Sequence, residues 1–252
     1  MIEGLYAAAT GMMAVEARQN VIANNIANAM TPGFRRQRSV DTGFYQLLFD
    51  KMRRPFWANR VTGPGGGAQV TETFTDLVGG TITTTGDPLQ VALRGPGYLV
   101  VDTPAGERLT RNGQLTVDAD GQLATDDGFK VQGSGGGGID VLEGKVQISS
   151  DGTVLSDEVP TGRLRIIEVE DPHALTRVGH SLYRAPDEVL EAAVEAVDTD
   201  IVPESLELSN VQLPYEMLQM ILGVRAYAAN QRVIMAIDET ASRLIDQVGT
   251  PV

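Results

Sequence analysis

The 252-residue sequence has no cysteine, two histidines and a single tryptophan. Without cysteine the chain forms no disulfide, and it offers neither a thiolate metal ligand nor a cysteine nucleophile. His173 and His180 lie seven residues apart in a loop-rich stretch, a spacing that does not match the pairing of helical zinc ligands. These absences argue against an enzyme, and we expect no catalytic residues, no cofactor and no metal site.

Basic residues and long apolar runs are also scarce. The chain carries 20 Lys and Arg against 33 Asp and Glu, and the net charge of −13 argues against nucleic-acid binding. No run approaches the ~20 apolar residues that span a bilayer. The apolar stretch Leu5–Val15 follows Glu3 and no Lys or Arg, so we expect no cleaved signal peptide.

Glycine, in contrast, is abundant, with 28 residues that indicate many turns. Gly133–Gly138 and Gly63–Ala68 match the spacing of dinucleotide-binding loops, but strand-like sequence follows each of them where such a loop opens a helix. Asp118–Gly121 lacks the ligands of a calcium loop and is typical of a turn. We therefore expect no small-molecule substrate.

Apolar and small side chains recur at alternating spacings of three and four through residues 1–30. This heptad row predicts a long helix of coiled-coil type, which Thr31-Pro32-Gly33 ends. The row comprises Leu5, Ala8, Met12, Val15, Gln19, Ile22, Ile26 and Ala29.

The same spacing returns after Pro214, which suits the first turn of a helix. A second row, Ile221, Ala228 and Met235, widens the apolar face beyond a two-stranded seam, and Gly249-Thr250-Pro251 closes the helix. Both ends of the chain are therefore predicted to be long helices that pack together and against something else. The main C-terminal row comprises Met217, Met220, Val224, Tyr227, Gln231, Ile234, Asp238, Ala241, Ile245 and Val248.

Between the helices the apolar period changes to two, with turn residues at short intervals. Asn112-Gly113 between two apolar segments predicts a hairpin, and Arg163–Val169 predicts a half-buried strand. We expect an α+β protein in which residues 85–209 form an antiparallel β domain and residues 34–84 an irregular connector. Residues 1–33 and 210–252 then form a terminal helical domain.

An acidic stretch lies at residues 187–207, where eight acidic side chains occur with no base. A solvated surface is the main interpretation of such a stretch, and a surface that faces a partner is the alternative.

Several segments of the chain form a specific, ordered pattern. The N-terminal ones are Leu5–Met12, Val21–Asn28 and Thr31–Phe34, the middle ones are Pro88–Leu93, Leu109–Gly113 and Asp118–Leu123, and the C-terminal ones are Leu206–Val211 and Arg225–Asn230. Together they resemble the bacterial flagellar rod and hook proteins over nearly the whole chain.

The resemblance implies a structural subunit of the basal-body rod, the axial polymer that transmits torque and surrounds the export channel. In this family both terminal helices form an inner tube, and the β domain forms an outer layer. The implied partners are other copies of the chain, other rod and hook proteins, the flagellar type III export apparatus and the surrounding rings. The implied location is the basal body in the cell envelope, reached without a cleaved signal.

Two finer alternatives stay open. Phe34–Arg38 and Tyr45-Gln46 are similar to the distal rod type, whereas Glu204-Ser205 departs from it and leaves the proximal rod type as the alternative. A different class is a helix-oligomerised β domain that binds cell-wall glycan. Such a site needs exposed aromatic side chains, and Trp57, six Tyr and six Phe supply few of them.

The two helical rows and the asparagines of the flagellar segments are the candidate subunit-interface residues. For Asn24, Asn25 and Asn28, hydrogen bonding between subunits competes with solvent-facing positions. The full set is Leu5, Met12, Val15, Ile22, Asn24, Asn25, Ile26, Asn28, Asn210, Met217, Met220, Val224, Tyr227, Asn230, Ile234 and Ile245.

Overall fold

The computed structural model describes residues 2–43, 68–141, 144–179, 181–191, 193–196 and 198–248. The chain divides into two compact units. The helical unit comprises residues 1–27, 37–75 and 212–252, and the β unit comprises residues 28–36 and 76–211. Several features considered above lie outside the described residues, namely Tyr45-Gln46, Trp57, Gly63–Gly67, His180 and Gly249–Pro251.

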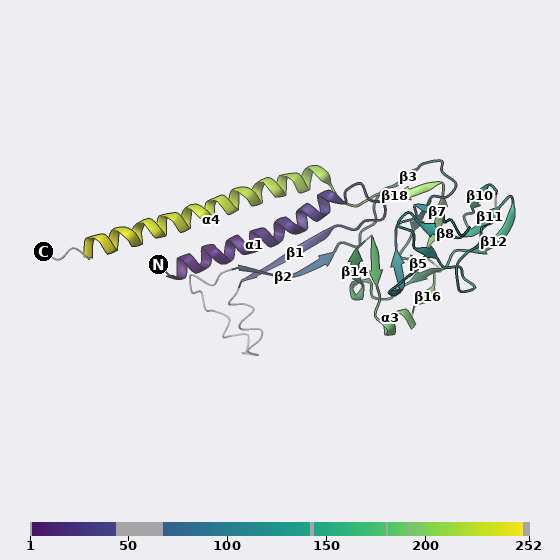
Figure 1. The fold of residues 1–252 in the computed structure, drawn as a ribbon, viewed down its shortest axis with the longest axis horizontal. Helices are drawn as coiled ribbons and strands as arrows, with labels where there is room; N and C mark the ends of the chain where they lie inside the picture. The colour runs from purple at the N-terminus through teal and green to yellow at the C-terminus, as the bar shows by residue number, and fades with distance from the viewer. Residues whose placement is uncertain are drawn as a thin grey trace. The chain divides into compact units, whose positions relative to one another are not determined.

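Two helices dominate the helical unit, α1 (Ile2–Ala27) and α4 (Leu213–Val248). They lie side by side in opposite directions, so that the start of α1 faces the C-terminal half of α4 (Figure 1). Both predicted helices are confirmed, α1 ending before Thr31-Pro32-Gly33 and α4 beginning one residue before Pro214. Among the described residues, neither these helices nor any other is long and apolar enough to cross a membrane.

The third element of the helical unit is an antiparallel strand pair that packs on α1. It consists of β1 (Gln37–Gly43) and β2 (Ala68–Thr75), with Gln37 paired to Thr75. These strands and β3 (Ile82–Thr84) fall within residues 34–84, the segment that we expected to form an irregular connector.

Among its described residues, the β unit contains short strands, the five-residue helix α3 (Asp187–Glu191) and a 3-10 helix at Pro172–Ala174. Its strands are β3, β4 (Val91–Arg94), β5 (Tyr98–Thr103), β6 (Gly106–Thr110), β7 (Leu115–Val117), β8 (Leu123–Thr125), β9 (Lys130–Val131), β10 (Val146–Ile148), β11 (Thr153–Ser156), β12 (Val159–Arg163), β13 (Ile166–Glu168), β14 (Thr176–Gly179), β15 (Leu182–Arg184), β16 (Val194–Glu195), β17 (Asp200–Pro203) and β18 (Ser205–Glu207).

The largest sheet of the β unit runs in the order β14-β15-β6-β5-β9-β8-β7, with β13 and β16 joined at β5. The pairings assigned among the described strands are antiparallel, which confirms the predicted α+β class. Short pairs complete the unit: β17 with β4, β18 with β3, and β11 between β10 and β12.

β5 shows how the core is built. Successive side chains of a strand point to opposite faces of the sheet. Leu99 and Val101 accordingly belong to one buried cluster, and Tyr98 and Val100 belong to another. Because both faces of β5 are covered by apolar side chains of the same chain, the β unit has a complete core of its own.

The predicted hairpin at Asn112-Gly113 is wrong. β7 pairs with β8 and not with β6, and the segment around Gly113 instead lies against β4, where Val91 N donates to Gly113 O at 3.0 Å. A Cβ on Gly113 would stand 1.7 Å from Val91 O, so the glycine serves this close backbone approach. The turn at Asp118–Gly121 is confirmed, with Gly121 N donating to Asp118 O at 2.9 Å.

Candidate functional site: the faces of the terminal helices

Three contacts define how α1 meets α4. A Cβ on Gly4 would lie 3.4 Å from Ile237 Cδ1, and a Cβ on Gly11 would lie 3.1 Å from Asn230 Nδ2. Gln19 Nε2 donates to the carbonyl oxygen of Met220 at 3.2 Å. The residue numbers rise along α1 as they fall along α4, so the helices are antiparallel with one continuous contact row.

On α1 the predicted row lies mostly on the covered side. Ala8 and Ile22 are buried, and Met12, Val15 and Ile26 are half-buried. Leu5 is the exception, with 42% of its surface exposed. The small side chains Ala8 and Ala14 let neighbouring backbone come close to the helix.

On α4 the row that contacts α1 is offset from the predicted one. The structure places Gly223, Asn230 and Ile237 against α1, one residue before the predicted Val224, Gln231 and Asp238. Of the candidate interface residues, Met220, Asn230 and Ile234 are half-buried. Four others are exposed within this chain, namely Met217, Val224, Tyr227 and Ile245.

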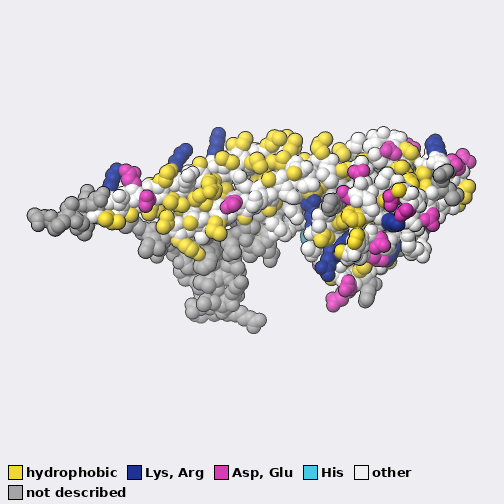
Figure 2. All heavy atoms as spheres, viewed as in Figure 1, with side chains coloured by type: hydrophobic (Ala, Val, Ile, Leu, Met, Phe, Trp, Pro, Cys, Tyr) yellow, Lys and Arg dark blue, Asp and Glu magenta, His cyan; other side chains and the backbone are white. Residues whose placement is uncertain are grey.

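α4 therefore presents a long apolar surface that the described part of the chain leaves exposed. The exposed side chains include Tyr215, Met217, Leu218, Ile221, Leu222, Val224, Val233, Met235, Leu244 and Ile245, each 45–70% exposed. Figure 2 shows hydrophobic side chains gathered along the helices of this unit. Single exposed apolar residues are ordinary, but a contiguous apolar surface marks a site of association.

The candidate asparagines around the end of α1 take part in contacts inside the chain. Asn25 is 1% exposed, donates from Nδ2 to Gln37 O at 2.8 Å and accepts at Oδ1 from Gln37 N at 2.9 Å. Its amide thus ties the first residue of β1 to α1. Asn28 Oδ1 accepts from Thr31 Oγ1 at 3.4 Å, in the turn that follows α1, and Asn24 is exposed.

Asn210 plays a similar part within the β unit. Its Oδ1 accepts from Arg36 N at 2.6 Å, and its Nδ2 donates to Val78 O at 2.8 Å and to Asp76 O at 3.1 Å. The side chain therefore joins three chain segments through backbone groups.

A buried ion network lies next to these segments, and its acidic member was missed by the sequence reasoning. Arg35 Nη2 lies 2.7 Å from Glu207 Oε1, and Arg111 Nη1 lies 3.7 Å from Glu207 Oε2. All three side chains are at most 6% exposed. Glu207 therefore does not belong to the solvated surface expected for residues 187–207. The local pattern gave no signal of this, because a Glu between Leu206 and Leu208 in an alternating strand would be expected on the solvent face.

Burial controls the protonation of the groups around this network. Desolvation raises the pKa of Tyr98 and raises the pKa of Tyr183 to about 12. Desolvation and the neighbouring Arg35 charge lower the pKa of Arg111, whose guanidinium lies 4.8 Å from the centre of the Tyr98 ring. The network places the buried Glu207 carboxylate beside two arginines, one of which lies over the Tyr98 ring.

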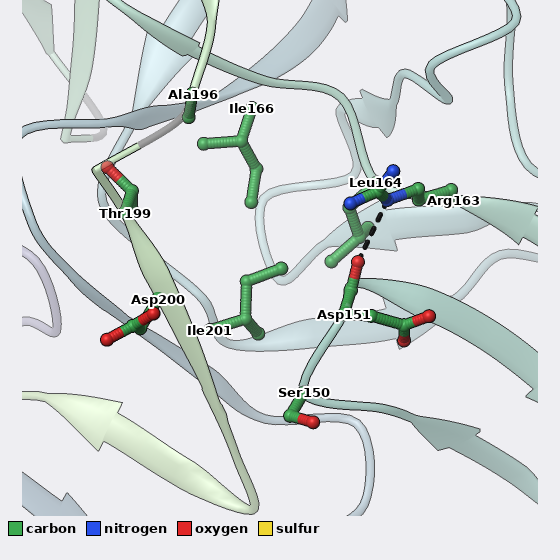
Figure 3. Close-up of a pocket in the computed structure, with 9 residues that line it drawn as sticks. All are labelled: Ser150, Asp151, Arg163, Leu164, Ile166, Ala196, Thr199, Asp200 and Ile201. Carbon is green, nitrogen blue, oxygen red and sulfur yellow. Dashed lines mark hydrogen bonds between the residues drawn. The ribbon is translucent and has the colours of Figure 1, made fainter.

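The β unit also contains a polar hollow (Figure 3). Its lining residues are Ser150, Asp151, Arg163, Leu164, Ile166, Ala196, Thr199, Asp200 and Ile201. Hydrogen bonds from the Thr153 side chain and backbone lower the pKa of Asp151, so this carboxylate stays ionised and acts as an acceptor. Arg163 Nε donates to Asp151 O at 2.9 Å, so the guanidinium already has a hydrogen-bond partner beside the hollow. The hollow shows the contacts of a folded turn rather than a nucleophile beside a base.

Comparison with known proteins gives these features a context. Three family models match the chain: "Flagella basal body rod protein" over residues 5–35, "Flagellar hook protein FlgE/F/G D1 domain" over 92–156, and "Flagellar basal body rod FlgEFG protein C-terminal" over 202–247. The matched segments include most of α1, the first half of the β unit and nearly all of α4.

Full-length relatives agree with the family models. Flagellar basal-body rod protein FlgF of Rhizobium meliloti is 30% identical over 251 residues, which cover 99% of both chains. Flagellar basal-body rod protein FlgG of Caulobacter vibrioides is 30% identical over 267 residues, covering 94% of this chain and 96% of the relative. FlgG of Bacillus subtilis is 29% identical, covering 98% and 99%. The chain belongs to the flagellar basal-body rod protein family.

Proposed function

We propose that the chain is a structural subunit of the flagellar basal-body rod, and that its terminal helices polymerise with those of other copies. The exposed apolar surface of α4 carries this proposal. Leaving that surface in water is unfavourable, and association with like helices removes it from water. In the rod such a subunit transmits torque and surrounds the export channel, and it performs no catalysis.

The candidate interface residues then divide into two groups. Met12, Ile22 and Ile234 lie on the sides of α1 and α4 that are at least half-buried within the chain. Val224 lies on the exposed side of α4, and Ile245 lies beyond the stretch of α4 that contacts α1, so both are available to another copy. Packing of the coiled-coil type between subunits, with a helix of another copy against this exposed side, is the arrangement we propose for the inner tube.

Other rod and hook proteins are the partners that we propose beside copies of the chain. Passage through the type III export apparatus suits a cysteine-free chain because it refolds without disulfide errors. The proposed site of assembly is the rod within the periplasmic space and its surrounding rings.

Two positions in the rod have specific support. Phe34–Arg38 favours the distal position, and the 99% coverage of both chains with a FlgF relative favours the proximal one. We infer the distal position from the segment that directly follows α1. Labelling the subunit in electron micrographs of purified basal bodies tests this, since label at the proximal end would overturn it.

A matched pair of valines tests the structural function. Val224 on α4 is 55% exposed, and Val159 on β12 is 54% exposed. Each is replaced by Asp in cells that lack the native gene. Because an unpaired carboxylate in an apolar interface is costly, Val224→Asp should abolish rods, hooks and swimming, whereas Val159→Asp should leave them.

Failed export and failed folding must be separated from failed assembly, so export of each variant is measured in the same cells and folding is measured on the purified protein. Circular dichroism of purified Val224→Asp should match that of the native chain, which separates failed assembly from failed folding. Swimming cells with intact filaments and Val224→Asp would contradict the proposal.

A further inference from the structure

Two pairs of residues in the contact between α1 and α4 share one design. In each pair a glycine on one helix faces a side-chain amide on the other. Gly11 on α1 faces Asn230 on α4, and Gly223 on α4 faces Gln19 on α1. Glycine is unfavourable in the interior of a helix, so its presence at both contact points suggests that packing requires it there.

The distances supply that reason. A Cβ on Gly11 would stand 3.1 Å from Asn230 Nδ2, and one on Gly223 would stand 2.6 Å from Gln19 Nε2. The missing Cβ at Gly223 leaves room for Gln19 to reach the backbone of α4, where its Nε2 donates to Met220 O at 3.2 Å. Each amide end therefore lies where a Cβ on the opposite helix would crowd it.

An apolar row with heptad spacing does not by itself select one alignment, because a slip of about seven residues again sets apolar side chains opposite one another. The two amides respond differently to such a slip. Moving α4 in one direction sets Gln19 opposite Asn230, so that two amides compete for one space. Moving it in the other direction sets Gly11 opposite Gly223, which leaves a gap.

We propose that the pairs Gly11–Asn230 and Gly223–Gln19 fix the register of α1 against α4. A polar residue in an otherwise apolar helix contact is an established means of selecting register. The register also decides where α4 continues without α1, since Ile237 lies opposite Gly4 and α4 extends on to Val248 (Figure 1). The use of a single register rests on the proposed function: subunits that polymerise must all present the same apolar faces to their neighbours.

A reciprocal exchange tests the register. Gly11→Asn places two amides in one space, Asn230→Gly leaves a gap, and the double variant restores one amide facing one glycine with the helices exchanged. The matched control is Ala9→Asn, on an exposed position of α1. Because the chain has no cysteine, register is read in the purified full-length protein from disulfide formation between introduced pairs. Gly4→Cys with Ile237→Cys reports the native register, and Gly4→Cys with Leu244→Cys reports a slip.

In the chain with the native Gly11–Asn230 and Gly223–Gln19 pairs, the yield of the 4/237 disulfide should exceed the yield of the 4/244 disulfide by about tenfold. Gly11→Asn should reduce this ratio toward one, because the native register then also holds two amides in one space. The double variant should relieve this clash yet keep a ratio near one, because the slip then sets Gln19 opposite the Asn230→Gly site, which leaves room for it. Ala9→Asn should leave the ratio unchanged. Rod yield in cells should follow the same order. A double variant that keeps the tenfold ratio of the native chain, or equal disulfides in the native background, would overturn the register proposal.

Failure of the proposed function has a different signature. Cells without the gene would then still build rods and swim, whatever the disulfide ratios of the purified chain.

Discussion

The β unit buries its apolar side chains within the chain, whereas the helical unit leaves many of its own exposed. In the β unit Leu99, Leu109 and Leu123 are 0% exposed. On α4, Leu218 and Leu222 are 52% and 47% exposed although both lie in regular helix. Since most of the stability of a helix comes from tertiary packing, we expect the β unit to fold by itself and the helical unit to be completed by assembly.

The largest effect is expected where the β unit holds buried charge. Replacing Glu207 with Leu leaves Arg35 and Arg111 without their shared carboxylate, and breaking a buried ion network costs about 3–5 kcal/mol. Urea denaturation of the purified chain, followed by circular dichroism, measures this loss. The control Glu188→Leu removes an exposed acid of the same acidic stretch and should change the free energy by less than about 0.5 kcal/mol. A loss below about 1 kcal/mol for Glu207→Leu would show that the network does not stabilise the unit.

A pair of leucines sharpens the comparison directly. Leu99→Ala creates a cavity in the β unit and should cost about 2–5 kcal/mol. Leu218→Ala, on the exposed side of α4, should cost the monomer less than about 0.5 kcal/mol and should lower rod yield instead. Equal losses of monomer stability from both variants would remove the distinction between the units.

Alkaline pH gives a smaller effect that is confined to the β unit. Burial raises the pKa of Tyr183 to about 12, above the value near 10 of an exposed tyrosine. The neutral phenol therefore contributes fully to stability below pH 10, and this contribution declines as the pH rises from about 10 to about 12. Denaturation of the native chain and of Tyr183→Phe over this range should show a weaker decline in the variant. Identical declines would mean that Tyr183 does not titrate as its burial requires.

Local patterns in the sequence predicted the elements but not their partners. Alternating spacings of three and four gave both helices, because amphipathic period is a property of a single segment. The row of α4 that contacts α1 depends on packing between segments about two hundred residues apart. There Gly223 and Asn230, which carry little apolar signal, take the places expected for Val224 and Gln231.

The same limit explains the misread polar residues. Asn112-Gly113 has the local chemistry of a hairpin turn, but its backbone joins β4, which precedes it by some twenty residues. Glu207 belongs to an acidic stretch by sequence and to a buried ion network in the fold, because Arg35 lies far away along the chain. A run of acidic residues predicts exposed side chains only where no residue from a distant part of the chain pairs with one of them.

Amide hydrogen exchange, compared between dilute monomer and assembled rods, tests the central claim most directly. We predict fast exchange in α1 and α4 of the monomer, slow exchange in both helices of the rod, and slow exchange of β5 in both states. Slow exchange throughout α1 and α4 in the dilute monomer would contradict the claim that assembly completes the helical unit.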